Sequence, residues 1–181
     1  MIVLGIDPGS HRCGYGVVAR DGSRLQVVES GVLVPGTLPM ADRLGRILVG
    51  LEAVIARARP GEVSVEQVFS GASARSALVL GQARGVALAA AARAGLPVFE
   101  YAPSEVKLAF TGSGRASKGQ MVRTARALLG VEAELADEAD AIALAVCHLA
   151  KRTARLAVAA TARNDVLGRL RPARRVHRRS P

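Results

Sequence analysis

Hydrophobic positions near the start of the chain follow the short periods of strands rather than the three-to-four spacing of helices. Residues 1–7 form an apolar run, residues 13–20 are rich in valine, and residues 25–34 alternate between apolar and polar side chains. A hairpin-type turn at Asp21-Gly22 separates the second run from the third. This pattern predicts a meander of three strands.

After residue 35 the pattern changes to helices that alternate with short strands. Apolar residues between positions 40 and 59 recur every three or four residues, and Pro60-Gly61 ends this helix. The remaining predicted elements are a strand at 62–68, a helix at 72–94, a strand at 97–101, a helix at 104–110, a polar loop at 111–119 and helices at 120–129 and 136–152. Within the helix at 72–94, Gly81 and Gly85 indicate either a break or a close approach of another element.

This order of elements predicts an α/β fold, with a five-stranded mixed sheet that has helices on both faces. The first strand and the strand at 62–68 are expected to pair as parallel neighbours, because a helix connects them as a crossover. We predict one folded domain over residues 1–152 and a basic, flexible C-terminal tail over residues 153–181. Residues 168–181 are expected to be unstructured, because they are similarly charged and have little to bury.

Composition and charge agree with a single folded domain that has a basic end. The chain has 181 residues, of which 50% are hydrophobic and 22% charged. The formal net charge is +10; residues 1–150 contribute +1 and residues 151–181 contribute +9. A polyphosphate partner such as nucleic acid fits this charge best, with an anionic membrane surface or a merely solvated tail as alternatives.

Targeting signals and disulfides are not indicated. Cys13 and Cys147 are too few for a disulfide framework, and neither belongs to a CxxC motif. The N-terminal residues lack the basic segment and long apolar run of a signal peptide, and the apolar stretches are too short to span a bilayer. We therefore expect a cytoplasmic protein with no membrane partner.

Two carboxylates occur in strands, where a protein core is normally apolar. Asp7 ends the first strand, and Glu66 interrupts the strand at 62–68. A buried carboxylate costs several kcal/mol unless it is paired or binds a cation. If the two strands are neighbours, these side chains can meet across the sheet.

Two further carboxylates share one face of the helix at 136–152. Asp137 and Asp140 are three residues apart, a spacing that places their Cβ atoms about 5–6 Å from each other. Each alone is explained by the helix dipole, as is Glu138 in the same turn. Together with Asp7 and Glu66, however, they form a cluster that needs cations to stay ionised.

Such a cluster indicates Mg²⁺ or Mn²⁺, because these ions prefer oxygen ligands. Two ions about 3.5–4 Å apart can activate a water and stabilise a leaving oxygen, which is typical of phosphodiester hydrolysis. His11, His148 and His177 lack the spacing of metal ligands, and we assign them no role.

Five sequence blocks, in order over about residues 1–150, resemble the RuvC family of Holliday-junction resolvases. They are GIDPGSHRCGYGV at 5–17, VEQVF at 65–69, SALVLGQARGVALAAA at 76–91, PVFEYAPSEVK at 97–107 and DEADAIALAVCH at 137–148. The resemblance implies a ribonuclease-H-like fold and a metal-dependent endonuclease that acts in DNA recombination and repair. Asp7, Glu66, Asp137 and Asp140 match the family's four acidic positions, although some relatives have histidine in place of Asp137.

The resemblance also implies partners and DNA contacts. The family works as a homodimer that makes two symmetric nicks in four-way junction DNA, with two Mg²⁺ or Mn²⁺ ions expected per site, and a RuvA/RuvB-like branch-migration helicase is an expected partner. Lys107 and Lys118 match basic positions near the cut strand, and Phe69 matches a residue that stacks on unpaired bases. The alternatives are exposed lysines that aid solubility and a phenylalanine at the edge of the core. The helix at 72–94 resembles the family's dimer-forming helix, with plain core packing as the alternative.

Three other functional classes explain parts of the sequence. An actin-like or sugar-kinase-like ATPase begins with a similar Gly-Ile-Asp-x-Gly-Ser segment, but it needs a second half that this chain lacks. A general ribonuclease H lacks the Gly-Gln-Ala-Arg-Gly block at 81–85. A non-catalytic module that binds branched DNA predicts a missing acid, and none of the four is missing.

Overall fold

The computed structural model describes residues 1–67, 73–131 and 136–169, with side chains described as far as residue 154. The chain separates into two compact units, Met1–Ala150 and Lys151–Pro181. The first unit contains the sheet, most of the helices and all four of the predicted acidic residues. None of the helices in the described part of the chain is long and apolar enough to cross a membrane.

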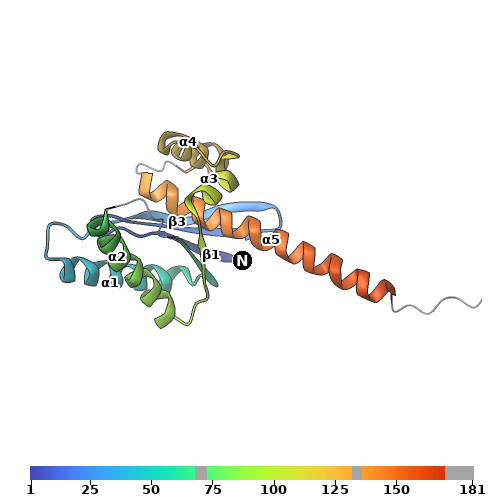
Figure 1. Cartoon of the computed structure of the whole chain (residues 1–181), viewed down its shortest axis with the longest axis horizontal. Coiled ribbons are helices and arrows are strands. Elements are labelled where there is room, and N and C mark those ends of the chain that lie inside the picture. The colour runs from blue at the N-terminus through green and yellow to red at the C-terminus, as the bar shows by residue number, and fades with distance from the viewer. Residues whose placement is uncertain (68–72, 132–135, 170–181) are drawn as a thin grey trace, which may run out of the picture. The chain divides into compact units, whose positions relative to one another are not determined.

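A five-stranded mixed sheet forms the centre of the first unit (Figure 1). Its strands are β1 (Ile2–Asp7), β2 (Cys13–Asp21), β3 (Arg24–Leu33), β4 (Glu62–Glu66) and β5 (Val98–Tyr101), arranged in the order β3-β2-β1-β4-β5. The first three strands are antiparallel, whereas β4 pairs in parallel with β1 and β5 in parallel with β4. The predicted sheet and the predicted parallel pairing of the first strand with the fourth are thus confirmed.

Helices cover both faces of this sheet (Figure 1). The helices are α1 (Met40–Ala58), α2 (Ala74–Arg93), α3 (Pro103–Thr111), α4 (Lys118–Leu129) and α5 (Ala136–Arg169). One core lies between the sheet and α1 and α2, and a second lies between the sheet and α3, α4 and the start of α5. Because both faces of β1 and β4 are covered, these strands are buried through their middle residues. β1 is apolar from Ile2 to Ile6, whereas β4 has the buried Ser64 between two buried valines.

Two predicted features of the helices differ from the structure. The helix predicted to end at residue 152 continues to Arg169, because the alanine-rich sequence that follows favours a helix despite its basic charge. Gly81 and Gly85 do not break α2, and within this chain a Cβ atom at either position would meet nothing within 4 Å. The predicted domain boundary at residue 152 remains a prediction, and the tail beyond Arg169 lies outside the described residues.

Candidate active site

The strand carboxylates lie at the same edge of the sheet, at the carboxyl ends of two parallel neighbours. Asp7 is the last residue of β1 and Glu66 the last residue of β4. Ile6 is paired with Val65 in the parallel ladder, so the next residue of each strand is a carboxylate. The register therefore brings Asp7 and Glu66 side by side, as the sequence predicts.

Glycines in β1 and β2 allow α5 to lie unusually close to this edge. A Cβ atom at Gly14 would lie 2.0 Å from the carbonyl oxygen of Asp137, and one at Gly5 would lie 2.0 Å from that of Ala141. Both contacts are with helix backbone, which cannot move aside without moving the whole helix. The first turns of α5, which carry Asp137 and Asp140, are thus held against the strand that carries Asp7.

A hydrogen bond from the third strand also holds the first turn of α5. The Ser30 hydroxyl on β3 donates to Oε1 of Glu138 at 2.6 Å. Glu138 is therefore engaged with the sheet, whereas Asp137 and Asp140 on either side of it are left for other contacts. This agrees with the prediction of a structural role for Glu138.

Three of the four predicted acids line one cavity of about 230 Å³ together with both predicted lysines. Its polar lining consists of Asp7, Glu66, Asp140, Lys107 and Lys118. Asp137, one turn before Asp140, is not part of this lining. Among the described residues, none forms a hydrogen bond or an ion pair with any of the four carboxylates, whose oxygens therefore keep their capacity to bind a ligand.

Burial and mutual repulsion raise the pKa values of these carboxyl groups. Burial, followed by the charges of Glu66, Asp140 and Asp137, raises the pKa of Asp7 to about 7, against a smaller lowering by Lys118. Burial is also the main cause of the raised pKa values of Glu66 and Asp140. The charge of Asp137 raises the pKa values of both Asp7 and Asp140, so it acts on the cavity from just outside it. Carboxylates that repel each other in this way favour either protons or bound cations.

The residues present fit divalent ions that share their coordination with substrate. No group of three or more histidine, cysteine, aspartate or glutamate side chains in the described ranges is arranged to hold a metal ion by itself. Mg²⁺, however, is commonly bound by one or two carboxylates, with water and substrate phosphate as the other ligands. Asp7, Glu66 and Asp140 offer such hard oxygen donors in one cavity.

The two predicted DNA-contacting lysines approach the acids from neighbouring helices. Lys107 lies in α3, and Lys118 is the first residue of α4, directly after Ser117 caps that helix through the Gln120 amide. Both lysines line the cavity, and their charges lower the pKa values of Glu66 and Asp140. The third predicted DNA-binding residue, Phe69, lies outside the described residues.

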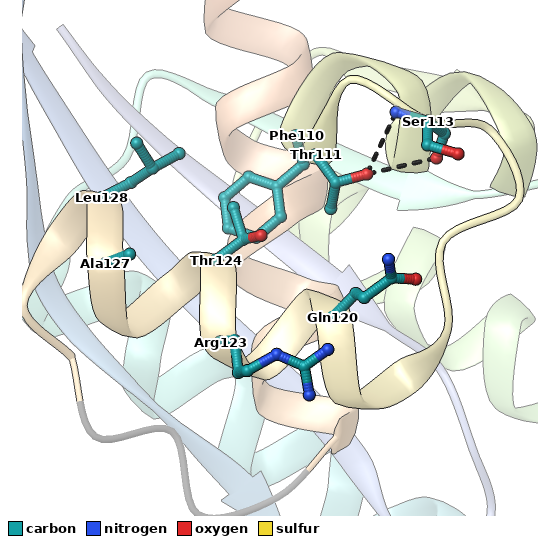
Figure 2. Close-up of a pocket in the computed structure, with 8 residues that line it drawn as sticks. All are labelled: Phe110, Thr111, Ser113, Gln120, Arg123, Thr124, Ala127 and Leu128. Carbon is teal, nitrogen blue, oxygen red and sulfur yellow. Dashed lines mark hydrogen bonds between the residues drawn. The ribbon is translucent and has the colours of Figure 1, made fainter.

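A larger hollow of about 540 Å³ between α3 and α4 is distinct from this cavity (Figure 2). Its lining consists of Phe110, Thr111, Ser113, Gln120, Arg123, Thr124, Ala127 and Leu128. Figure 2 shows Arg123 and Gln120 at one end and Leu128 at the other. Because no carboxylate contributes to this lining, we assign the chemistry to the smaller acidic cavity.

Sequence reasoning missed the residues that position α5. The sequence did not predict a role for the glycines of β1 and β2 or for the Ser30–Glu138 hydrogen bond. Gly14 and Gly16 gave a usable signal, because glycines at alternate positions of a strand leave one face without side chains. The Ser30–Glu138 hydrogen bond left no recognisable signal in the sequence, because it joins residues 108 positions apart.

Comparisons with known proteins agree with this site. Residues 3–148 match the family described as crossover junction endodeoxyribonuclease RuvC. The protein of that name from Anaeromyxobacter sp. (strain K) is 75% identical over 100% of both chains. The one from Trichlorobacter lovleyi is 51% identical over 82% of this chain and 85% of its own. The structure of T. thermophilus RuvC in complex with Holliday junction substrate is 37% identical, covers 82% of this chain and 93% of its own, and has a TM-score of 0.76.

Proposed function

The chain belongs to the RuvC family of crossover junction endodeoxyribonucleases, and from that premise we propose how its own residues cut DNA. It is a divalent-metal-dependent nuclease that resolves Holliday junctions in recombination and repair, with the ribonuclease-H-like fold of its structural neighbours. The observation that carries the site assignment is the cavity that Asp7, Glu66 and Asp140 line together, where none of the described residues pairs with these carboxylates.

In this proposal, Asp7 and Glu66 hold a pair of Mg²⁺ or Mn²⁺ ions, and Asp140 and Asp137 complete the set. Asp7 is the most central group, because the charges of the three other acids all act on it. When bound, the ions supply an activated water for attack on phosphorus and stabilise the leaving 3′-oxygen. The protein's part is to keep the carboxylates deprotonated and aimed at one point.

Lys107 and Lys118 are proposed to hold the phosphate that is cut. Both line the same cavity as the acids, so they would supply positive charge to a phosphate that binds beside the carboxylates. Ser117 caps the helix that Lys118 begins, which fixes the direction of the backbone at that point. Phe69 is proposed to stack on an unpaired base next to the nick, a role that rests on the resemblance.

A homodimer is proposed to place two such cavities on opposite strands of the junction. The support lies on the outer face of α2, where Leu78 is 65% exposed. One and two turns further, Gly81 and Gly85 have open space around them. An exposed leucine beside small residues allows the same helix of a second copy to approach closely. A RuvA/RuvB-like helicase partner and a cytoplasmic location remain predictions.

The alternative of a non-catalytic module that binds branched DNA does not fit. It predicts a degenerate acidic site, whereas all four acids are present and three share a cavity. The relatives that match the whole chain are, moreover, named as endonucleases.

The experiment that tests this function gives the purified protein a mobile four-way junction and a linear duplex of equal length, each with Mg²⁺, Mn²⁺ or EDTA. We expect paired nicks in the junction with either ion, little cutting of the duplex and none in EDTA. Glu66→Gln and Asp140→Asn should bind the junction almost as well as the native protein but fail to nick it. Equal cutting of both substrates would contradict junction selectivity, and cutting by either variant would contradict the site.

A further inference from the structure

A buried hydrogen-bonded chain of three side chains joins Glu62 at the start of β4, His148 of α5 and Tyr101 at the end of β5, the residue that is paired with Glu66 in the β4–β5 ladder. The Tyr101 hydroxyl lies 2.7 Å from Nδ1 of His148, and Nε2 of His148 lies 2.5 Å from Oε2 of Glu62. His148 is 1% exposed and Tyr101 2% exposed. The ring of Phe99 packs on the imidazole, with the two ring centroids 4.5 Å apart.

A neutral imidazole satisfies both contacts in a single tautomer. A carboxylate oxygen can only accept, so Nε2 of the imidazole donates to Glu62. In the neutral form, Nδ1 then carries a lone pair and accepts a hydrogen bond from the Tyr101 hydroxyl. Such buried polar contacts are the kind that select one register between packed elements.

The contact between Glu62 and His148 matters because β4 and α5 also carry the acids Glu66 and Asp140. From Glu62 to Glu66 the strand advances four residues, about 13 Å at the usual rise. From His148 back to Asp140 the helix covers eight residues, about 12 Å. Glu62 is hydrogen-bonded to His148, and Glu66 lines one cavity together with Asp140. The two segments therefore run side by side with matching lengths.

Between these two ends the buried residues of α5 are apolar. They include Ile142, Leu144 and several alanines, and Gly5 of β1 lies against the helix backbone at Ala141 and Ala145. Apolar contacts of this kind stabilise the packing but have no preferred direction. The hydrogen bonds of His148 give α5 directional contacts with β4 and β5, in addition to those from Arg20 on β2 to the Leu149 carbonyl and from Ser30 on β3 to Glu138.

We propose that His148, held between Tyr101 and Glu62, is a positioning residue that fixes the register of α5 against β4 and thereby sets the separation of Asp140 from Glu66. This inference rests on the proposed function, because it concerns the geometry with which those two acids bind metal ions. His148 does not touch substrate or ions itself. Its effect reaches the cavity through the rigid helix and strand.

The test compares the full-length protein with three variants. His148→Leu keeps apolar bulk but removes both hydrogen bonds, whereas His148→Gln keeps one N–H donor and one oxygen acceptor. Tyr101→Phe removes a single hydroxyl and serves if the leucine variant fails to fold. Val54→Ala is the matched control, because Val54 is fully buried in the core on the opposite face of the sheet and its loss destabilises the fold without touching α5.

The measurements are the Mn²⁺ dissociation constant by calorimetry without DNA, and junction nicking as a function of Mn²⁺ concentration. We expect Mn²⁺ binding by His148→Leu to weaken by about tenfold or more, as for other residues that orient metal ligands. Tyr101→Phe should shift the same way, and His148→Gln should stay close to the native affinity. In the weakened variants, the Mn²⁺ concentration that gives half of the maximal nicking rate should rise. The maximal nicking rate itself, measured at saturating Mn²⁺, should change far less.

Native Mn²⁺ affinity in both His148→Leu and Tyr101→Phe would overturn the inference. It would also be overturned if His148→Gln were as weak as His148→Leu, or if Val54→Ala weakened Mn²⁺ binding equally, because general destabilisation would then explain the effect. If the native protein neither binds Mn²⁺ nor nicks the junction, the proposed function itself is wrong. That result is separate from any difference between variants.

Discussion

At the scale of single residues, the charge on Asp7 opposes folding while it prepares the site for cations. Its pKa of about 7 lies well above the ordinary value of 3.8, chiefly through burial. Between these two pH values the folded state keeps a proton that the unfolded state has lost, so the free energy of unfolding falls as pH rises through this range. Above about pH 7 the full cost of the buried charge is present.

Asp7→Asn should therefore stabilise the metal-free protein at pH 8 and stabilise it less at pH 5, where only part of the cost that builds up between pH 3.8 and about 7 is present. The gain at pH 8 should reach a few kcal/mol, since each pKa unit corresponds to about 1.4 kcal/mol. Urea unfolding in EDTA at both pH values measures this, with Asp21→Asn at the exposed last residue of β2 as the control. A variant that is less stable than the native protein at pH 8 would show that Asp7 is not in a repulsive site.

The individual acids could be predicted because a carboxylate in an apolar strand needs an explanation. Asp7 and Glu66 were located by residue type and strand pairing alone. The different placement of Asp137 and Asp140 could not be predicted, because a spacing of three residues fixes only a shared helix face and not which side chain reaches the cavity. That choice depends on how α5 sits on the glycines of β1 and β2.

At the scale of elements, the closeness of α5 to the sheet is the property on which the site depends. Gly14→Ala should lower stability and nicking sharply, because its Cβ atom would lie 2.0 Å from the Asp137 carbonyl oxygen and would push the helix away. Gly45→Ala in α1 is the matched control, since its Cβ atom meets nothing within 4 Å and alanine favours a helix by about 0.5–1 kcal/mol. Thermal unfolding and junction nicking of both variants check this. Equal behaviour of the two would contradict the packing argument.

The sequence allowed the order and type of the elements to be predicted, but not every boundary. Hydrophobic periodicity located the helix at Met40–Ala58 to within one residue, because one of its faces is buried and the other is solvated. The end of α5 at Arg169 was not predicted, since alanine and arginine are common both in helices and in basic tails. The sequence shows that residues 81 and 85 are glycines, but it does not show whether another element of the chain packs against them.

At the scale of the whole molecule, α2 is the proposed contact between two copies. Leu78→Glu should convert a dimer into a monomer and replace paired nicks by single ones, because it places charge in an apolar interface. Val49→Glu in α1 is a matched control, since Val49 is 66% exposed and Leu78 is 65% exposed. Light scattering after size-exclusion chromatography gives the mass. A Leu78→Glu variant that remains dimeric, or a Val49→Glu variant that also dissociates, would contradict this interface.

The charge of the C-terminal end is expected to act on DNA of any sequence. Residues 170–181 contain five arginines and no acidic residue. Replacing these arginines by glutamine should weaken binding to the junction and to a linear duplex alike. The slope of log K against log salt should decrease by up to about 0.9 for each arginine that contacts a phosphate. Binding measured from low to high salt tests this, and an effect confined to the junction would contradict a purely electrostatic role.

The central claim is that Asp7, Glu66 and Asp140 bind divalent ions together with the DNA phosphate. The most direct test is the anomalous diffraction of Mn²⁺ in crystals of the protein with a junction whose scissile phosphate cannot be cut. The account predicts two Mn²⁺ peaks in the acidic cavity, each ligated by at least one of these carboxylates and by the phosphate between Lys107 and Lys118. A bound junction with no Mn²⁺ in this cavity, or with Mn²⁺ held by other side chains, would contradict it.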